Sequence, residues 1–184
     1  MVKSVAVFLG SSSGSEDHLN FARNFGQELA RRGYKAIYGG AEVGTMKAFA
    51  DGVIDAGGEI TGVFPKGFGG KREVAATHRH IESTRATRTI EVADLAERMK
   101  VMNSLSDCCV ILPGGYGSME ELFCYAVDNE IGAHDKIAYV LNTKGYYDAL
   151  EKLVDTMKNE HFLKTDSQVI RFAHSIDELF ENLK

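Results

Sequence analysis

Tryptophan is absent from this 184-residue chain, and proline, with 2 residues, and cysteine, with 3, are scarce. So little proline argues against a Pro-rich disordered chain or a collagen, and so few cysteines argue against a disulfide scaffold. The apolar run near the N-terminus, Val5 to Leu9, is too short for the core of a signal peptide or for a membrane span. The sequence therefore predicts a cytoplasmic protein with no membrane partner.

Positive charge is also in short supply, because 21 Lys and Arg face 26 Asp and Glu and leave a net charge of -5. Proteins that bind nucleic acid or anionic lipid neutralise phosphates with surplus Lys and Arg. We therefore expect no nucleic-acid partner, although a local basic site stays open.

Metal-binding patterns are missing as well. Cys108, Cys109 and Cys124 do not have the spacing of metal-binding cysteine pairs, so we expect reduced thiols. His78 and His80 have no third ligand at a suitable spacing. We expect no metal site.

What the chain does contain is the composition of an ordinary globular protein, with 44% hydrophobic and 26% charged residues and 19 glycines. A chain of this length buries roughly 70% of the surface it exposes when unfolded, which is enough for one self-supporting core. With no internal repeat and no linker, residues 1–184 are expected to form a single α/β domain.

Short apolar runs alternate with segments of helical period along the whole chain. Strands are expected at residues 5–9, 35–38, 60–64, 108–112, 137–141 and 168–172. Helices are expected at residues 16–32, 45–56, 94–105, from 116 or 118 to 131, 146–157 and 175–183. Residues 66–88 are interpreted as a long functional loop with at most one short strand. This alternation predicts a doubly wound, mostly parallel sheet with helices on both faces, a Rossmann-like fold that binds its ligand beyond the carboxyl ends of the strands.

Three glycine-containing turns, at residues 10–14, 39–44 and 113–118, follow expected strands and precede expected helices. Free backbone N–H groups and the helix dipole favour an anion such as phosphate at such places. None of the turns has the GxGxxG pattern of a dinucleotide site or the GxxxxGK pattern of a P-loop. One such turn needs no explanation beyond a tight backbone bend, but three at one sheet edge favour a site for a nucleotide phosphate.

The segment Pro113 to Glu121, with the sequence PGGYGSMEE, is the most informative. Its glycines allow a ligand to approach the backbone closely. Ser118 has the residue type of a helix cap, and Glu121 three residues later would complete a capping box. The same carboxylate, near a helix N-terminus, also suits a general base or the stabilisation of an oxocarbenium ion. The two roles are compatible, and both stay open.

These residues resemble a known family. The stretch from Asp94 to Tyr147 is similar to the Lonely Guy family of cytokinin-activating phosphoribohydrolases, whose members are often labelled lysine decarboxylases. The family motif PGGxGTxxE is matched by Pro113 to Glu121, with Ser118 in place of Thr. The similarity extends to the opening VFLGSSSG, to the YGG that begins at Tyr38 and to a GxHxKxxxxLNxxGYYD stretch.

The resemblance implies an α/β homodimer that cleaves the N-glycosidic bond of a nucleoside 5'-monophosphate, of the AMP or cytokinin riboside type. The products would be the free base and ribose 5-phosphate, with water as the second substrate and no cofactor. Arg98 and Glu121 are implied as the catalytic pair, and we assign the permanently charged Arg98 to orienting phosphate or Glu121. The turns and the resemblance together give the expected substrate-binding residues: Gly10, Ser11, Gly39, Gly40, Glu73, Met99, Gly114, Gly115, Tyr116, Gly117, Ser118 and Glu120.

The chain also departs from the family pattern. The departures that bear on the site fall at Ala41, Lys47, Met99, Cys124 and Asp128, the last of which replaces the family Trp. They motivate an alternative, a nucleotide-binding protein with lost or narrowed hydrolysis. Lys47 and Lys100 would restore positive charge near a phosphate. Lysine decarboxylation is disfavoured, because it requires pyridoxal phosphate on a lysine and no lysine here lies in a recognisable cofactor context.

Overall fold

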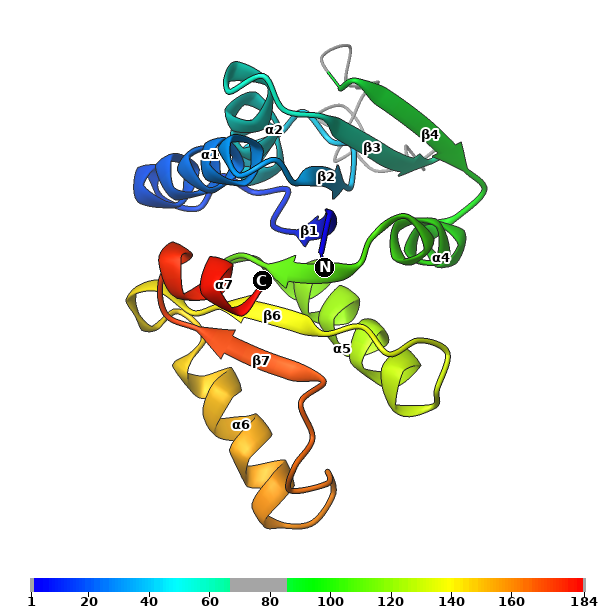
Figure 1. The fold of residues 1–184 in the computed structure, drawn as a ribbon, viewed down its shortest axis with the longest axis vertical. Coiled ribbons are helices and arrows are strands. Elements are labelled where there is room, and N and C mark those ends of the chain that lie inside the picture. Colours follow the sequence, from blue (N-terminus) through cyan, green and yellow to red (C-terminus); the bar gives the residue numbers. More distant parts are fainter. Residues whose placement is uncertain (1, 67–85, 184) are drawn as a thin grey trace.

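Residues 2–66 and 86–183 are the part of the chain that this computed structural model describes. Within them, seven parallel strands form one sheet in the order β4-β3-β2-β1-β5-β6-β7. The strands are β1 Ser4–Phe8, β2 Lys35–Tyr38, β3 Ile60–Pro65, β4 Arg88–Val92, β5 Cys108–Ile111, β6 Ala138–Leu141 and β7 Ile170–Ala173. The helices are α1 Glu16–Arg31, α2 Gly44–Asp55, α4 Leu95–Leu105, α5 Tyr116–Glu130, α6 Asp148–Asn159 and α7 Ile176–Asn182, with a 3-10 turn η1 at Thr143–Gly145. The expected doubly wound α/β fold is confirmed (Figure 1).

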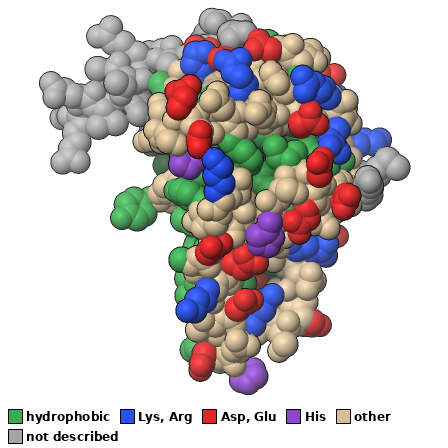
Figure 2. All heavy atoms as spheres, turned by 90° about the vertical axis from the view of Figure 1, so that its left-hand side faces the viewer, with side chains coloured by type: hydrophobic (Ala, Val, Ile, Leu, Met, Phe, Trp, Pro, Cys, Tyr) green, Lys and Arg blue, Asp and Glu red, His purple; other side chains and the backbone are tan. Residues whose placement is uncertain are grey.

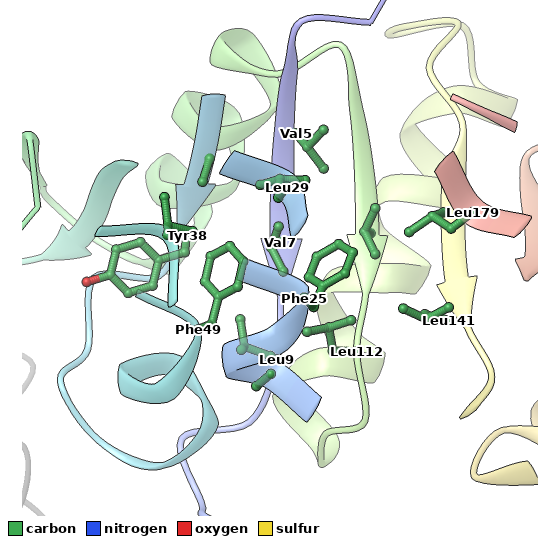
Figure 3. Packing of buried hydrophobic residues seen from close by; sticks show 14 of the residues in the cluster. Val5, Val7, Leu9, Phe25, Leu29, Tyr38, Phe49, Leu112, Leu141 and Leu179 are labelled. Carbon is green, nitrogen blue, oxygen red and sulfur yellow. The ribbon is translucent and has the colours of Figure 1, made fainter. Parts of the chain in front are cut away.

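The sheet separates two hydrophobic cores because successive side chains of a strand point to opposite faces. Val5 and Val7 of β1 pack with Phe25 of α1 and Phe49 of α2, as Figure 3 shows. Ala6 and Phe8 pack on the other face. Helices α1, α2 and α7 contribute to the first core, and α4, α5 and α6 to the second. Strands buried on both faces explain the continuous apolar runs in the sequence.

Strand β4 is the one element of the described sheet that the sequence did not predict. It pairs in parallel with β3, with Thr61 opposite Arg88 and Pro65 opposite Val92. Most of its residues are exposed or half-buried, since it lies at the edge of the sheet. Its alternation of polar and apolar residues therefore gives no continuous apolar run. The preceding segment, which includes Glu73, His78 and His80, lies outside the described residues.

The direction of strand addition reverses between β1 and β5. The strands β2, β3 and β4 extend the sheet on one side of β1, and β5, β6 and β7 extend it on the other. At such a reversal the connections leave the two strands on opposite faces, which opens a crevice beyond their carboxyl ends. Gly10 and Gly114 both lie at this edge, and an ideal Cβ at Gly10 would be 3.6 Å from the Gly114 Cα.

The surface carries charges of both signs. On the face drawn in Figure 2, Lys and Arg side chains are interspersed with Asp and Glu, and hydrophobic side chains gather across its middle. Ion pairs link α1 and α2, where Arg23 lies 2.8 Å from Asp55 and 3.2 Å from Asp51. Among the described residues, no helix has the length and hydrophobicity needed to cross a membrane.

Candidate active site

A cleft of about 1400 Å³ opens at the carboxyl ends of the central strands. The turns after β1, β2 and β5 and the helices α4 and α5 contribute to its walls. The expected site residues that line it are Gly10, Ser11, Gly39, Gly40, Arg98, Met99, Gly114, Gly115, Tyr116, Gly117, Ser118, Glu120 and Glu121. Glu73 lies outside the described residues. The cleft therefore collects residues that are more than 100 positions apart in the sequence.

A buried ion pair lies in the wall of the cleft. The Arg98 Nη2 of α4 donates to the Glu121 Oε1 of α5 at 2.6 Å, with the two side chains 13% and 10% exposed. The Arg98 Nε is buried and has no partner within the described residues. Burial raises the pKa of Glu121 from 4.5 to about 7, although the nearby Arg98 charge lowers it and Glu120 raises it further. Near neutral pH this carboxyl is therefore divided between its protonated and ionised forms.

Gly39, the first residue after β2, makes room for the arginine of this pair. An ideal Cβ at Gly39 would lie 2.5 Å from the Arg98 Nη2 and 3.1 Å from its Cζ. No real side chain tolerates such a contact, so any residue larger than glycine would push the guanidinium away from Glu121. The glycine turn after β2 thus serves the geometry of the ion pair as well as the bend in the chain.

The turn after β5 differs from the capping box that the sequence predicted. Helix α5 begins at Tyr116 with Gly115 as its N-cap, so Ser118 lies inside the first turn rather than at the cap. The capping-box prediction was wrong because the glycines let the helix begin earlier, and the Glu121 carboxylate turns to Arg98 instead. The backbone N–H groups of Tyr116, Gly117 and Ser118 precede the first intrahelical donor, the Met119 N–H, which donates to the Gly115 carbonyl at 3.2 Å. They are therefore available to a ligand.

Ser118 adds an unpaired hydroxyl to this turn. Its side chain is buried, with 2% of its surface exposed, and its Oγ has no partner within the described residues. An ideal Cβ at Gly114 would lie 2.1 Å from that oxygen, so only glycine fits beside it. On the other side of the reversal, the Thr45 hydroxyl donates to the Gly10 carbonyl at 2.7 Å and ties α2 to the turn after β1.

The residues that depart from the family pattern lie in two places. Ala41, Met99, Cys124 and Asp128 line the cleft, as does Lys100. Lys47 does not; its Nζ lies 2.5 Å from Asp51 on the same helix. Along α5, Glu120, Cys124 and Asp128 follow one another at intervals of four residues and present one polar stripe to the cleft.

Several residues that line the cleft were not expected from the sequence, among them His18 and Tyr146. Tyr147, the neighbour of Tyr146, is buried and packs in the core. The Tyr146 hydroxyl instead donates to the Gly114 carbonyl at 2.8 Å, and its ring meets His18 edge-on with centroids 5.7 Å apart. The GYYD segment offered a signal for Tyr146, whereas nothing in the sequence marked His18.

The three cysteines are free, whereas the candidate metal ligands His78 and His80 lie outside the described residues. Cys108 and Cys109 are buried and free, and burial raises the pKa of Cys108 to about 12. Cys124 is free and exposed. Burial also raises its pKa, assisted by the nearby Glu120 and Asp128. Within the described ranges, no group of three His, Cys, Asp or Glu side chains is arranged to hold a metal ion.

Comparison with protein families and curated proteins gives consistent matches. The family described as "Possible lysine decarboxylase" matches residues 46–183. The cytokinin riboside 5'-monophosphate phosphoribohydrolase LOG5 of Arabidopsis thaliana is 34% identical over 184 residues, covering 99% of this chain and 77% of the relative. The probable phosphoribohydrolase of the same kind LOGL1 of Oryza sativa subsp. japonica is 37% identical over 182 residues, covering 98% of this chain and 78% of the relative.

Solved structures with the same fold are more distant in sequence. The molybdenum cofactor binding protein of Rippkaea orientalis matches with a TM-score of 0.72 and 18% identity, over 100% of this chain and 96% of that one. The molybdenum cofactor carrier protein of Chlamydomonas reinhardtii matches with a TM-score of 0.70 and 20% identity, over the same shares of the two chains. At these identities the likeness extends to the fold alone.

Proposed function

The chain belongs to the Lonely Guy family, whose family description reads "Possible lysine decarboxylase", and on that premise we propose that it is a phosphoribohydrolase. It hydrolyses the N-glycosidic bond of a nucleoside 5'-monophosphate, of the AMP or cytokinin riboside type, to the free base and ribose 5-phosphate. The observation that carries the proposal is the buried Arg98–Glu121 pair in one cleft with the free N–H groups at the start of α5.

The phosphate lies at the switch between β1 and β5. There the N–H groups of Tyr116, Gly117 and Ser118 and the positive end of the α5 dipole face an anion. The unpaired Ser118 hydroxyl supplies one further donor. Gly10 and Gly114 leave the backbone open to the phosphate, because neither carries a side chain that would fill the crevice.

Glu121 and Arg98 act on the ribose. When the bond between C1' and the base nitrogen breaks, its electron pair leaves with the base and positive charge builds on the ribose ring. The ionised Glu121 stabilises that charge, and it accepts a proton from the water whose oxygen adds to C1'. Glu121 then releases that proton and the departing base nitrogen takes up one proton, so the reaction consumes one water and releases no net proton. Arg98 holds the carboxylate in place and transfers no proton.

The residues present do not fit a decarboxylase that uses pyridoxal phosphate. A Schiff-base lysine is commonly desolvated in its pocket, which lowers its pKa. The two lysines that line the cleft within the described ranges, Lys66 and Lys100, are both exposed. Lys66 is also paired with Glu91 at 3.1 Å. We therefore assign no cofactor chemistry to this site.

A second copy of the chain is the proposed partner. Phe123 and Val127 of α5 and the C-cap residue Ile131 follow one another at intervals of four and are 36%, 53% and 74% exposed. An apolar stripe of this kind on a soluble domain favours burial against another protein surface. We expect sedimentation of the wild type as a homodimer, and Val127→Glu should shift it towards the monomer.

Product analysis tests the activity directly. Purified protein is incubated with AMP, other nucleoside monophosphates and isopentenyladenosine monophosphate, and free base and ribose 5-phosphate are measured. We expect an adenine-type base from the monophosphate and little from the unphosphorylated nucleoside. Glu121→Gln and Arg98→Ala should each lower kcat by about 100-fold or more, whereas Glu130→Gln, an exposed position at the far end of α5, should not. Saturable binding without turnover of any monophosphate would overturn the hydrolase in favour of a nucleotide-binding protein.

A further inference from the structure

His18 is held in a fixed orientation at the start of α1. Its Nδ1 accepts the backbone N–H of Ser15 at 3.1 Å, and the Ser15 hydroxyl lies 3.0 Å from the same nitrogen. A backbone N–H can only donate, so Nδ1 is the acceptor and the proton of the neutral ring lies on Nε2. Gly14, with φ +62°, permits this arrangement, because an ideal Cβ there would lie 2.7 Å from the His18 Nδ1.

The same ring lines the cleft between two of the turns that form the phosphate site. On one side lies the connection after β1, which contributes Ser11 and Ser12 to the cleft. On the other side the ring meets Tyr146, whose hydroxyl donates to the Gly114 carbonyl. Within the described residues the His18 Nε2 has no partner, and it is not among the buried unpaired atoms. The ring therefore offers a preset donor to whatever occupies the cleft.

Two of the three Lys and Arg side chains that line the cleft within the described residues are already engaged, and the third, Lys100, is exposed. Arg98 is paired with Glu121, and Lys66 is paired with Glu91. Phosphate at the start of α5 would otherwise rely on backbone dipoles, on the Ser118 hydroxyl and on the exposed Lys100. A donor from α1, which lies across the crevice from α5, would contact the phosphate from the side opposite the α5 N–H groups.

We propose that His18 binds the substrate phosphate, its Nε2–H donating to a phosphate oxygen of the nucleoside 5'-monophosphate. This inference rests on the proposed function for the identity of the ligand. His18 touches no reacting bond in this arrangement, so it is a binding residue. It separates monophosphates from unphosphorylated nucleosides, and its loss should change KM and leave kcat nearly unaltered.

Two substitutions separate this role from a purely structural one. The amide oxygen of His18→Asn lies near the position of Nδ1 and keeps an acceptor for the Ser15 N–H, but the variant has no donor at the position of Nε2. The amide nitrogen of His18→Gln reaches the position of Nε2 and restores that donor. A phosphate contact predicts that Asn fails and Gln rescues, whereas a role confined to the start of α1 predicts the reverse.

We expect His18→Asn to raise the KM for AMP by about 10- to 100-fold, the effect of one hydrogen bond to a charged group. The kcat should stay within about twofold of the wild type, and His18→Gln should recover most of the KM. Wild-type KM in His18→Asn, or a defect in His18→Gln alone, would overturn the proposal. Circular dichroism and thermal melting confirm that both variants are compared as folded protein.

Calorimetry keeps this test independent of turnover. AMP, ribose 5-phosphate and adenosine are titrated into protein that also carries Glu121→Gln, which removes hydrolysis. We expect His18→Asn to weaken AMP and ribose 5-phosphate by the same factor and to leave adenosine unchanged. An equal effect on adenosine, or binding of neither phosphate by the parent protein, would refute a phosphate contact. Failure of hydrolysis with intact, His18-dependent AMP binding would overturn only the proposed reaction.

Discussion

Glu121→Gln should stabilise the folded protein above pH 7 while it removes hydrolysis. The carboxyl is 10% exposed and lies against Arg98, yet burial outweighs that attraction and raises its pKa from 4.5 to about 7. At about 1.4 kcal/mol for each pH unit, this gap corresponds to about 3 kcal/mol of unfolding free energy. Glutamine has the shape of the protonated acid and cannot ionise, so it avoids the penalty.

The sign of the effect fixes its pH window. Below about pH 4.5 the carboxyl is protonated in the folded and the unfolded state, so the group contributes fully to stability there. Between pH 4.5 and about 7 the unfolded chain ionises while the folded protein retains the proton, and stability falls. Above pH 7 the carboxyl is ionised in both states, and the folded protein has lost the whole of the roughly 3 kcal/mol of unfolding free energy. The two proteins should therefore be equally stable near pH 4 and differ by about 3 kcal/mol at pH 8.

Urea unfolding measured at pH 5, 6, 7 and 8, at one protein concentration, gives the required free energies. Glu130→Gln removes a carboxylate from the exposed end of the same helix and serves as the control. Its stability should run parallel to that of the wild type across the range. Parallel curves for Glu121→Gln as well, or a wild type that gains on this variant above pH 7, would refute a buried carboxyl of raised pKa.

The other predictions concern turnover, packing and reactivity. In the wild type, kcat/KM should rise about tenfold per pH unit below pH 7 and level off above it, because the ionised Glu121 is the active form. A kcat/KM that does not change between pH 5 and pH 8 in a stopped assay would contradict this. Gly39→Ala should displace Arg98 and lower kcat with a change in Tm of only a few degrees, since the atom it meets is the end of a flexible side chain. Tyr125→Phe should leave the free energy of unfolding in urea unchanged or raise it by about 1 kcal/mol, because the buried hydroxyl has no partner among the described residues. Iodoacetamide at pH 8.5 should label Cys124 and slow turnover, and saturating AMP should protect it; mass spectrometry of the labelled peptide decides.

Apolar runs and helical periods predicted most of the fold because its strands are short, parallel and buried on both faces. They failed at β4, where a half-exposed edge strand carries Arg88 and Glu91 and shows no such run. The capping box failed for a local reason. Sequence patterns do not say whether Gly115 or Ser118 is the N-cap of α5, and in the structure it is Gly115.

The site was predictable only where a motif marked it. The Gly-rich turns and the PGGYGSMEE segment led to the floor of the cleft, and the family resemblance added the pairing of Arg98 with Glu121, which spacing alone did not indicate. His18 and Tyr146 escaped notice because their significance comes from a contact between α1 and the segment after β6. A contact across 128 positions leaves no local pattern at His18, and the GYYD segment marked Tyr146 without indicating its partner.

The two strands that flank the crevice lie in the centre of the described sheet and are almost wholly buried. Residues Val5 to Phe8 of β1 and Cys108 to Ile111 of β5 are at most 2% exposed, and each strand is hydrogen-bonded on both edges. Amide hydrogens in such strands exchange with solvent mainly through global opening. The turns after β1 and β5 are therefore anchored in strands that open only when the whole fold opens. Deuterium labelling should find slow amide exchange in the strands directly beneath the cleft.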